Sequence, residues 1–145
     1  MKVAQGMIGR VLVARFDKGE ELLESIKKVC KEVGIKHGIV YGVGGLSKVR
    51  LSVGSVDGES KVIEIDTKEK ITNVSTLIGI ISTLGDEVHL HVHLTLSQPN
   101  GTIISGCVLP GNLVNPSLEV VILEIQKAKL KRVIKEGYEL LEPHE

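Results

Sequence analysis

The segment from Val88 to Gly111 reads VHLHVHLTLSQPNGTIISGCVLPG, and its first half alternates strictly between histidine and aliphatic residues. Side chains of a β-strand point alternately to its two faces, so His89, His91 and His93 are predicted to share one face and the aliphatic residues the other. Burying three imidazoles is costly unless something pairs with their charge or binds their lone pairs. The segment therefore predicts a strand with an apolar core face, and either a metal site or a solvent-exposed polar face on its histidine side.

A hairpin is expected next, because residues 99–101 (Pro-Asn-Gly) suit a tight three-residue loop. Proline presets the first turn angle, and glycine can adopt the left-handed conformation that closes the loop. In this register Cys107 lies opposite His93, and directly opposed residues share a face. A slip of one residue would instead move the thiol to the apolar face. Imidazole and thiolate together suit zinc, with cobalt, nickel or iron as other occupants.

Several segments along the chain resemble one known family. In order, they are RFDKGE (15–20), GVGGLS (42–47), LIG (77–79), HVHLTLS (91–97), SGCV (105–108), NPSLE (115–119), LKR (130–132) and LL (140–141). Together they resemble the plants-and-prokaryotes conserved (PPC) domain, which accompanies AT-hooks in plant nuclear proteins. Its prokaryotic pattern is H-x-H-x-x-L-S, a turn with D-G, and then G-G-H-L. The resemblance covers nearly the whole chain and implies a β-sheet with a flanking helix that assembles as a homotrimer.

The resemblance also implies site residues. His91 and His93 would be metal ligands, and Cys107 stands where prokaryotic members usually carry a third histidine. His89 lies outside the matched pattern and is either a fourth ligand or a replacement. Glu119 matches the glutamate of the family's P-T-x-E segment, so it either orients a ligand histidine or accepts a proton from a substrate. The alternative for Glu119 is an exposed strand residue or a subunit contact.

Composition limits the class of protein. The 145 residues fit one domain, 1–145, and 18 basic residues balance 18 acidic ones. A net charge of zero argues against a strongly electrostatic nucleic-acid binder, whose affinity comes from neutralising phosphates. Only three residues are aromatic, so there is little platform on which bases could stack.

The chain is expected to be a cytoplasmic protein. It shows no signal-peptide pattern and no apolar run of membrane-spanning length. Cys30 falls in a helical pattern and Cys107 in a strand, so the two cysteines do not resemble a disulfide pair. Free thiols are typical of a reducing compartment.

The expected fold class is α+β, a mostly antiparallel β-sheet with one main flanking helix at about residues 19–33. Apolar residues recur on one helical face there, and Gly34 would end the helix. Within it, Cys30 is expected to be a buried small hydrophobe. The tail, 127–141, favours a helix by composition and a final strand with a turn at Gly137 by resemblance. Strands are predicted at 7–16, 35–43, 47–53, 51–56, 61–66, 71–83, 88–97, 102–109 and 117–126.

Glycines in two of these strands need an explanation. The G-x-G-G at 42–45 does not predict a dinucleotide site, because a strand pattern follows it instead of a helix. A bulge or a close approach of neighbouring backbones is the better interpretation. Gly79 likewise predicts a bulge or kink.

Charged residues outside the histidine strand favour ordinary surface roles. His37 and His144 are expected at the surface. Arg10, Arg15 and Arg50 either bind an anion near the glycine segment or form surface ion pairs. The basic run Lys127, Lys129, Lys131, Arg132 and Lys135 is expected to be the solvated face of a strand or helix. The AT-hook's R-G-R-P-type core is not found in the sequence, so the support for DNA as a partner is weak.

Two functional hypotheses follow. The first is a stand-alone PPC-domain protein, a metal-binding homo-oligomer with a regulatory or DNA-associated role. The second is a zinc-dependent enzyme, decarboxylase-like or hydrolytic, because three protein ligands leave an open coordination position at which a water or a carbonyl could be activated. The family fold resembles that of acetolactate decarboxylase, which uses a histidine-ligated zinc. The number of protein ligands separates the two hypotheses, since four would close the site.

Overall fold

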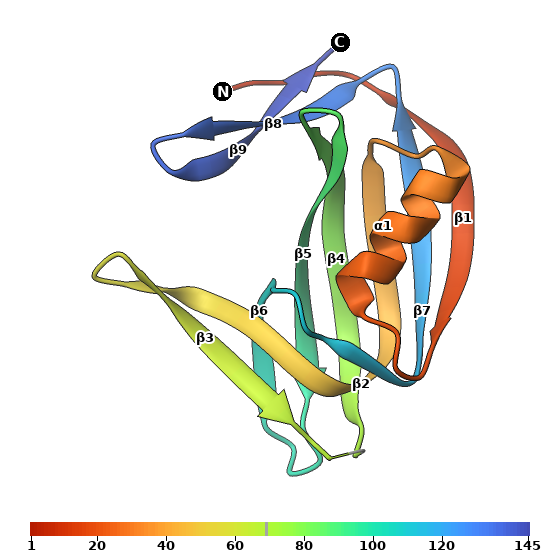
Figure 1. The fold of residues 1–145 in the computed structure, drawn as a ribbon. Helices are drawn as coiled ribbons and strands as arrows, with labels where there is room; N and C mark the ends of the chain where they lie inside the picture. Colours follow the sequence, from red (N-terminus) through yellow and green to blue (C-terminus); the bar gives the residue numbers. More distant parts are fainter. Residues whose placement is uncertain (69) are drawn as a thin grey trace.

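The computed structural model describes residues 1–68 and 70–145, and in them one helix covers one face of a nine-stranded sheet (Figure 1). This confirms the predicted class of a mostly antiparallel sheet with a flanking helix. The elements are β1 (Met7–Asp17), α1 (Leu22–Val33), β2 (Gly38–Val56), β3 (Glu59–Asp66), β4 (Thr72–Leu84), β5 (Glu87–Ser97), β6 (Ile103–Val108), β7 (Leu113–Gln126), β8 (Lys129–Lys135) and β9 (Tyr138–His144).

The long strand β2 connects the two parts of the sheet. The strand order is β1-β7-β2-β6-β5-β4-β8-β9, with β3 paired to β2 and a further pairing of β2 with β4. The first half of β2 pairs with β4 and β7, while its second half pairs with β3 and, at two positions, with β6. Strands β2, β4, β5 and β6 therefore form a closed circuit of pairings. Every pairing is antiparallel except a bridge between β4 and β8.

The glycine-rich segment bends β2 without ending it, so the prediction of two strands at 35–43 and 47–53 is wrong. Pairing with β4 and β7 shifts register around Gly44, as expected of a bulged strand. A Cβ on Gly44 would lie 2.3 Å from the backbone oxygen of Ser117, and one on Gly45 would lie 2.3 Å from that of Asn115. The close-approach interpretation is confirmed. Neighbouring backbone occupies the space that a side chain would need.

Helix α1 is amphipathic, and its buried side packs over the sheet (Figure 1). It begins at Leu22 because the Glu21 carboxylate accepts from the Glu24 N–H and caps the first turn. Gly34, at φ 77°, ends it as predicted. Cys30 is fully buried, and burial raises the pKa of its thiol to about 11, which confirms the expected core role. Within the described residues, α1 included, no helix has the length and apolarity to cross a membrane.

The tail forms a C-terminal hairpin, β8–β9, at the end of the sheet where β4 meets β5 (Figure 1). Its turn is Glu136-Gly137, and both residues have positive φ. The helix that composition favoured is therefore wrong, and the strand and turn implied by the family resemblance are confirmed. A bridge between Thr83 and Lys131 attaches this hairpin to β4, beside the start of the histidine strand.

Strand β4 differs from its prediction at Gly79. Gly79 pairs regularly with Val40 on one side and with Val92 on the other, and the register shift lies between Val74 and Thr76. A Cβ at Gly79 would lie 2.7 Å from Cγ2 of Val92. Glycine is required here for packing against β5 and does not mark a bulge.

Candidate metal centre

The histidines of β5 lie on the sheet face opposite to α1. Val92, Leu94 and Leu96, which alternate with the later histidines, are at most 1% exposed and belong to the core. His91 and His93 are exposed. The period-two prediction for this strand is confirmed, and the apolar residues hold the imidazoles in place by packing beneath them.

The hairpin after β5 brings a cysteine to the same face. The Gly101 N–H donates to the Gln98 carbonyl at 2.9 Å, and the Gln98 N–H donates to the Thr102 carbonyl at 2.9 Å. This closes the tight loop that 99–101 predicts. Cys107 consequently pairs with His93 across β5 and β6, so the predicted register is confirmed.

One donor atom from each of His91, His93 and Cys107 lies within 4.8 Å of the other two. The two Nε2 atoms of the histidines are 3.0 Å apart, and their rings meet edge to face at 66°. Ligands of a tetrahedral zinc lie roughly 3.3–3.8 Å apart, since each stands about 2.0–2.3 Å from the ion. Small side-chain rotations would bring the three atoms to that geometry, and two imidazoles with a thiolate fit zinc.

Without a metal, the surroundings of the group favour the neutral forms of His91 and Cys107. Partial burial of the ring is the main cause that lowers the pKa of His91, and the neighbouring His93 and Arg132 lower it further. Its ring therefore keeps a lone pair available at neutral pH. Burial raises the pKa of the Cys107 thiol. A metal that binds there must displace the thiol proton, because the thiolate is the ligand form.

His89 has a different partner. Its Nε2 lies 2.6 Å from the Oε2 of Glu139, which belongs to β9 in the C-terminal hairpin. Its Nδ1 is buried and has no hydrogen-bond partner among the described residues. The structure thus places His89 on the same face but outside the group of three donor atoms.

Sequence reasoning missed a buried arginine next to His89. Arg132 is only 9% exposed, so the interpretation of it as part of a solvated basic face is wrong. Its Nε donates to Ser82 Oγ at 3.2 Å, and its Nη1 donates to the Glu139 carbonyl at 3.1 Å. Lys129 and Lys131, which alternate with it on β8, are exposed as expected.

Glu119 lies away from the histidines in this chain. It is exposed on β7, opposite Arg15 on β1 and Val43 on β2. Strands β2 and β4 separate β7 from β5, which corresponds to about 14 Å across three strand spacings. Glu119 instead lines an open cavity of about 370 Å³ on the uncovered face, together with Tyr41.

The remaining candidates have ordinary surroundings. The ring of His37 accepts the Leu130 N–H through Nδ1 at 3.2 Å, and His144 is exposed. The three arginines considered as anion ligands all form ion pairs, which is the commoner role that we expected. The pairs are Arg10–Glu124, Arg15–Asp17 and Arg50–Glu64.

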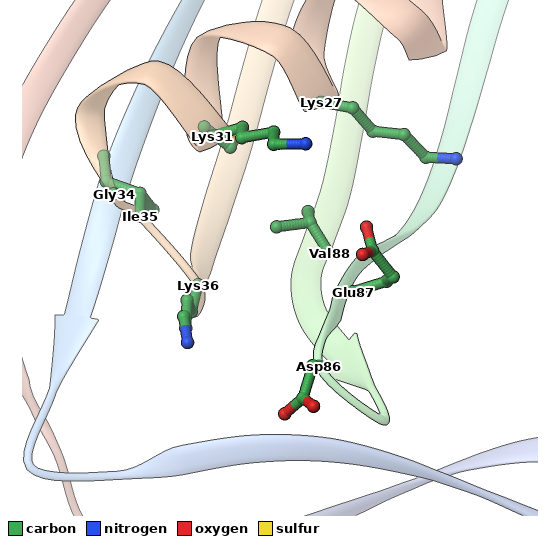
Figure 2. Close-up of a pocket in the computed structure, with 9 residues that line it drawn as sticks. Lys27, Lys31, Gly34, Ile35, Lys36, Asp86, Glu87 and Val88 are labelled. Carbon is green, nitrogen blue, oxygen red and sulfur yellow. The ribbon is translucent and has the colours of Figure 1, made fainter.

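A separate cavity of about 180 Å³ lies at the C-terminal end of α1, on the other side of β5 from the histidines (Figure 2). Its lining includes the apolar side chains of Ile35 and Val88. Lysines from the helix end face the acidic turn before β5 across it (Figure 2). With charges of both signs at its rim, this cavity shows no preference for an anion or a cation.

The fold and the site together define a small β-rich protein. Its mostly antiparallel sheet carries a His/His/Cys group on the face that α1 leaves uncovered. The chain belongs to the Plants and Prokaryotes Conserved domain family, whose model matches residues 3–126. The family resemblance of the sequence is thereby confirmed.

Solved structures share the fold over almost the whole chain. A plant- and prokaryote-conserved protein from Pyrococcus horikoshii is 28% identical, with a TM-score of 0.87 over 100% of this chain and 99% of that one. A metal-containing protein from Archaeoglobus fulgidus is 20% identical, with a TM-score of 0.85 and full coverage of both chains. A protein from Bacteroides thetaiotaomicron, named for a proposed DNA-binding role, is 20% identical, with a TM-score of 0.80 and 96% coverage of each. No curated protein matches the chain significantly.

Proposed function

We propose that this protein binds a transition metal, zinc foremost, through His91, His93 and Cys107. The observation that carries the proposal is the convergence of their three donor atoms within 4.8 Å, from two strands that the hairpin holds in register. The name of the Archaeoglobus fulgidus relative as a metal-containing protein supports it. Two neutral nitrogens and one thiolate would select zinc over magnesium or calcium, which prefer oxygen ligands.

Metal analysis of purified protein tests this proposal. We expect about one zinc per chain in the wild type and its loss in His91→Ala and in Cys107→Ala. His144→Ala is the matched control, since it removes an exposed imidazole away from the group and should leave the zinc content unchanged. A wild-type protein that takes up no metal from zinc-containing buffer would contradict the proposal.

We also propose that the protein is a homo-oligomer, for which the family resemblance implies three copies. One row of side chains crosses the uncovered sheet face by direct strand pairing: Val13, Val121, Tyr41, Ile78, His93 and Cys107. Its four apolar members are 37–72% exposed. A continuous apolar surface of this kind is typical of an interface between protein chains.

The enzyme hypothesis remains the second candidate, and the position of His89 favours it. With His89 engaged by Glu139, the proposed site has three protein ligands, which is the arrangement of catalytic zinc sites. A metal at this position would polarise a carbonyl or activate a water.

A DNA-associated or regulatory role rests on the names of relatives. The proteins from Bacteroides thetaiotaomicron and Ralstonia eutropha are named for a proposed DNA-binding role. The net charge of zero argues against strong direct binding of DNA by this chain. We therefore propose that any association with DNA goes through a partner protein. In a gel-shift titration with mixed DNA at physiological salt, direct binding should be no tighter than about 10⁻⁴ M. Tighter binding would contradict the proposal that the protein associates with DNA only through a partner.

A further inference from the structure

Arg132 is buried, and in the part of the chain that the structure describes its guanidinium donates to no carboxylate. Among the described residues, its hydrogen bonds go to two neutral oxygens, Ser82 Oγ and the Glu139 carbonyl, and it forms no ion pair. Burial lowers the pKa of its guanidinium. A guanidinium has five N–H donors in a planar fork suited to carboxylate and phosphate. A buried charge is costly unless an opposite charge compensates it, so this arrangement favours an anion at Arg132.

The carboxylate whose charge acts on Arg132 belongs to Glu139, and it pairs with His89. Its Oε2 lies 2.6 Å from the Nε2 of His89. Its charge raises the pKa of Arg132 less than burial lowers it. Arg132 donates to the backbone carbonyl of Glu139, and no hydrogen bond joins it to the carboxylate of that residue.

Arg132 lies beside the proposed metal ligands. Ser82, which accepts from its Nε, is directly opposite His89 in the pairing of β4 with β5. His89 and His91 point to the same face and stand about 6.8 Å apart along the strand. The β8–β9 hairpin thus places a guanidinium at one end of the histidine row, and Cys107 lies at the other, opposite His93.

We propose that Arg132 binds the oxyanion of a small organic ligand, a carboxylate or a phosphate, while a second oxygen of that ligand fills the open coordination position of the metal. This inference rests on the proposed metal site, because His91, His93 and Cys107 must hold the ion. It assigns the ligand class: small anions with at least two oxygens, one anionic oxygen for Arg132 and one oxygen for the metal. Arg132 fixes the charged end, and the metal fixes the other.

Cobalt-loaded full-length protein tests the inference by its visible absorption spectrum, which responds to a change in the metal's ligands. The probes are glycolate for carboxylates and inorganic phosphate for phosphates, at constant ionic strength against chloride. We expect at least one of them to change the wild-type spectrum saturably, and the one that does so identifies the oxyanion. Arg132→Met should raise its apparent Kd at least about tenfold, since a hydrogen-bonded charge is lost.

Lys131→Met is the matched control. It removes the same charge from the next position of β8, where the side chain is exposed, and should leave the Kd unchanged. Arg132→Met should still bind cobalt, because it leaves all three ligands in place. Should it fail to fold, Arg132→Gln, which still donates to Ser82, decides by the same tenfold criterion.

The outcomes separate the two proposals. A wild-type protein that binds no cobalt overturns the metal site. Cobalt-loaded protein whose spectrum neither probe changes overturns the ligand inference alone. An unchanged Kd in the folded Arg132 variant also overturns it.

Discussion

Cys107 is the member of the proposed metal centre with the most distinctive chemistry, because it is the only sulfur donor of the three. Cys107→His should keep the metal, since a third imidazole is equally a zinc ligand. Cys107→Ala should weaken zinc binding by about 100-fold or more, because changes to mere neighbours of metal ligands already cost 10–100-fold.

The absorption spectrum of the cobalt-loaded protein checks this prediction. The wild type should show the strong near-ultraviolet band of a thiolate–cobalt bond. Cys107→His should lose that band and keep its visible cobalt bands. A band that persists in Cys107→His would mean that the sulfur of Cys107 is not a ligand.

The sheet face on which a side chain lies was predictable wherever the two-residue period of a strand decides it. The period of two assigned His91 and His93 to one face, and the turn 99–101 added Cys107. The same period applied to β8 would have separated Arg132 from the lysines, because it shares the side of the buried Leu130. Its role depends on Glu139 and Ser82, and no local pattern shows that those residues meet.

At the scale of elements, one ion pair joins β1 to β7. Hydrogen bonds from Arg10 lower the pKa of Glu124 to about 2, so the folded state favours the ionised carboxylate. The Glu124 carboxylate contributes fully to stability above its pKa in the unfolded chain, about 4.5. This contribution is lost as the pH falls towards 2. Glu124→Gln should therefore be less stable than wild type at pH 7, and the difference should vanish near pH 2.

Urea unfolding at several pH values measures this difference. The control is Glu64→Gln, whose partner Arg50 is on an exposed part of the sheet. That pair is largely in solvent and should contribute between about 0 and 1 kcal/mol at any pH. Equal pH dependence in Glu124→Gln and wild type would show that the Arg10 contact contributes nothing.

Elements were predictable where their signals are local. The helix with its glycine end and the hairpin at 99–101 follow from short-range chemistry. The length of β2 does not, because whether Gly44 and Gly45 end a strand or bend it depends on the backbone of β7 beside them. The composition of the tail also suits a helix. It forms strands because β8 pairs with β4 and with β9, and these pairings are not visible in the local sequence.

At the scale of the whole molecule, the two faces of the sheet differ in what covers them. Helix α1 covers one side of the sheet, whereas the other side exposes apolar residues in line with the proposed metal ligands. A second copy of the chain would bury that surface. Neither period nor composition shows which strands lie side by side, so this row was not predictable from the sequence.

The oligomer can be tested with two lysine substitutions at equally exposed valines. Val121 on the uncovered face and Val33 at the end of α1 are both 37% exposed. Val121→Lys should dissociate the assembly, because an unpaired charge buried in an interface costs several kcal/mol. Val33→Lys should not, since it lies on the helix side of the sheet, near a helix C-terminus where a positive charge is favourable.

Sedimentation velocity measures the outcome. For three copies, the wild type and Val33→Lys should sediment at three times the chain mass of 15.7 kDa, and Val121→Lys at the chain mass. Val121→Lys should remain folded, because its side chain already reaches solvent in the single chain. A wild-type protein that sediments at the mass of one chain would contradict the proposed oligomer. A Val121→Lys protein that keeps the wild-type mass would show that the interface lies on another surface.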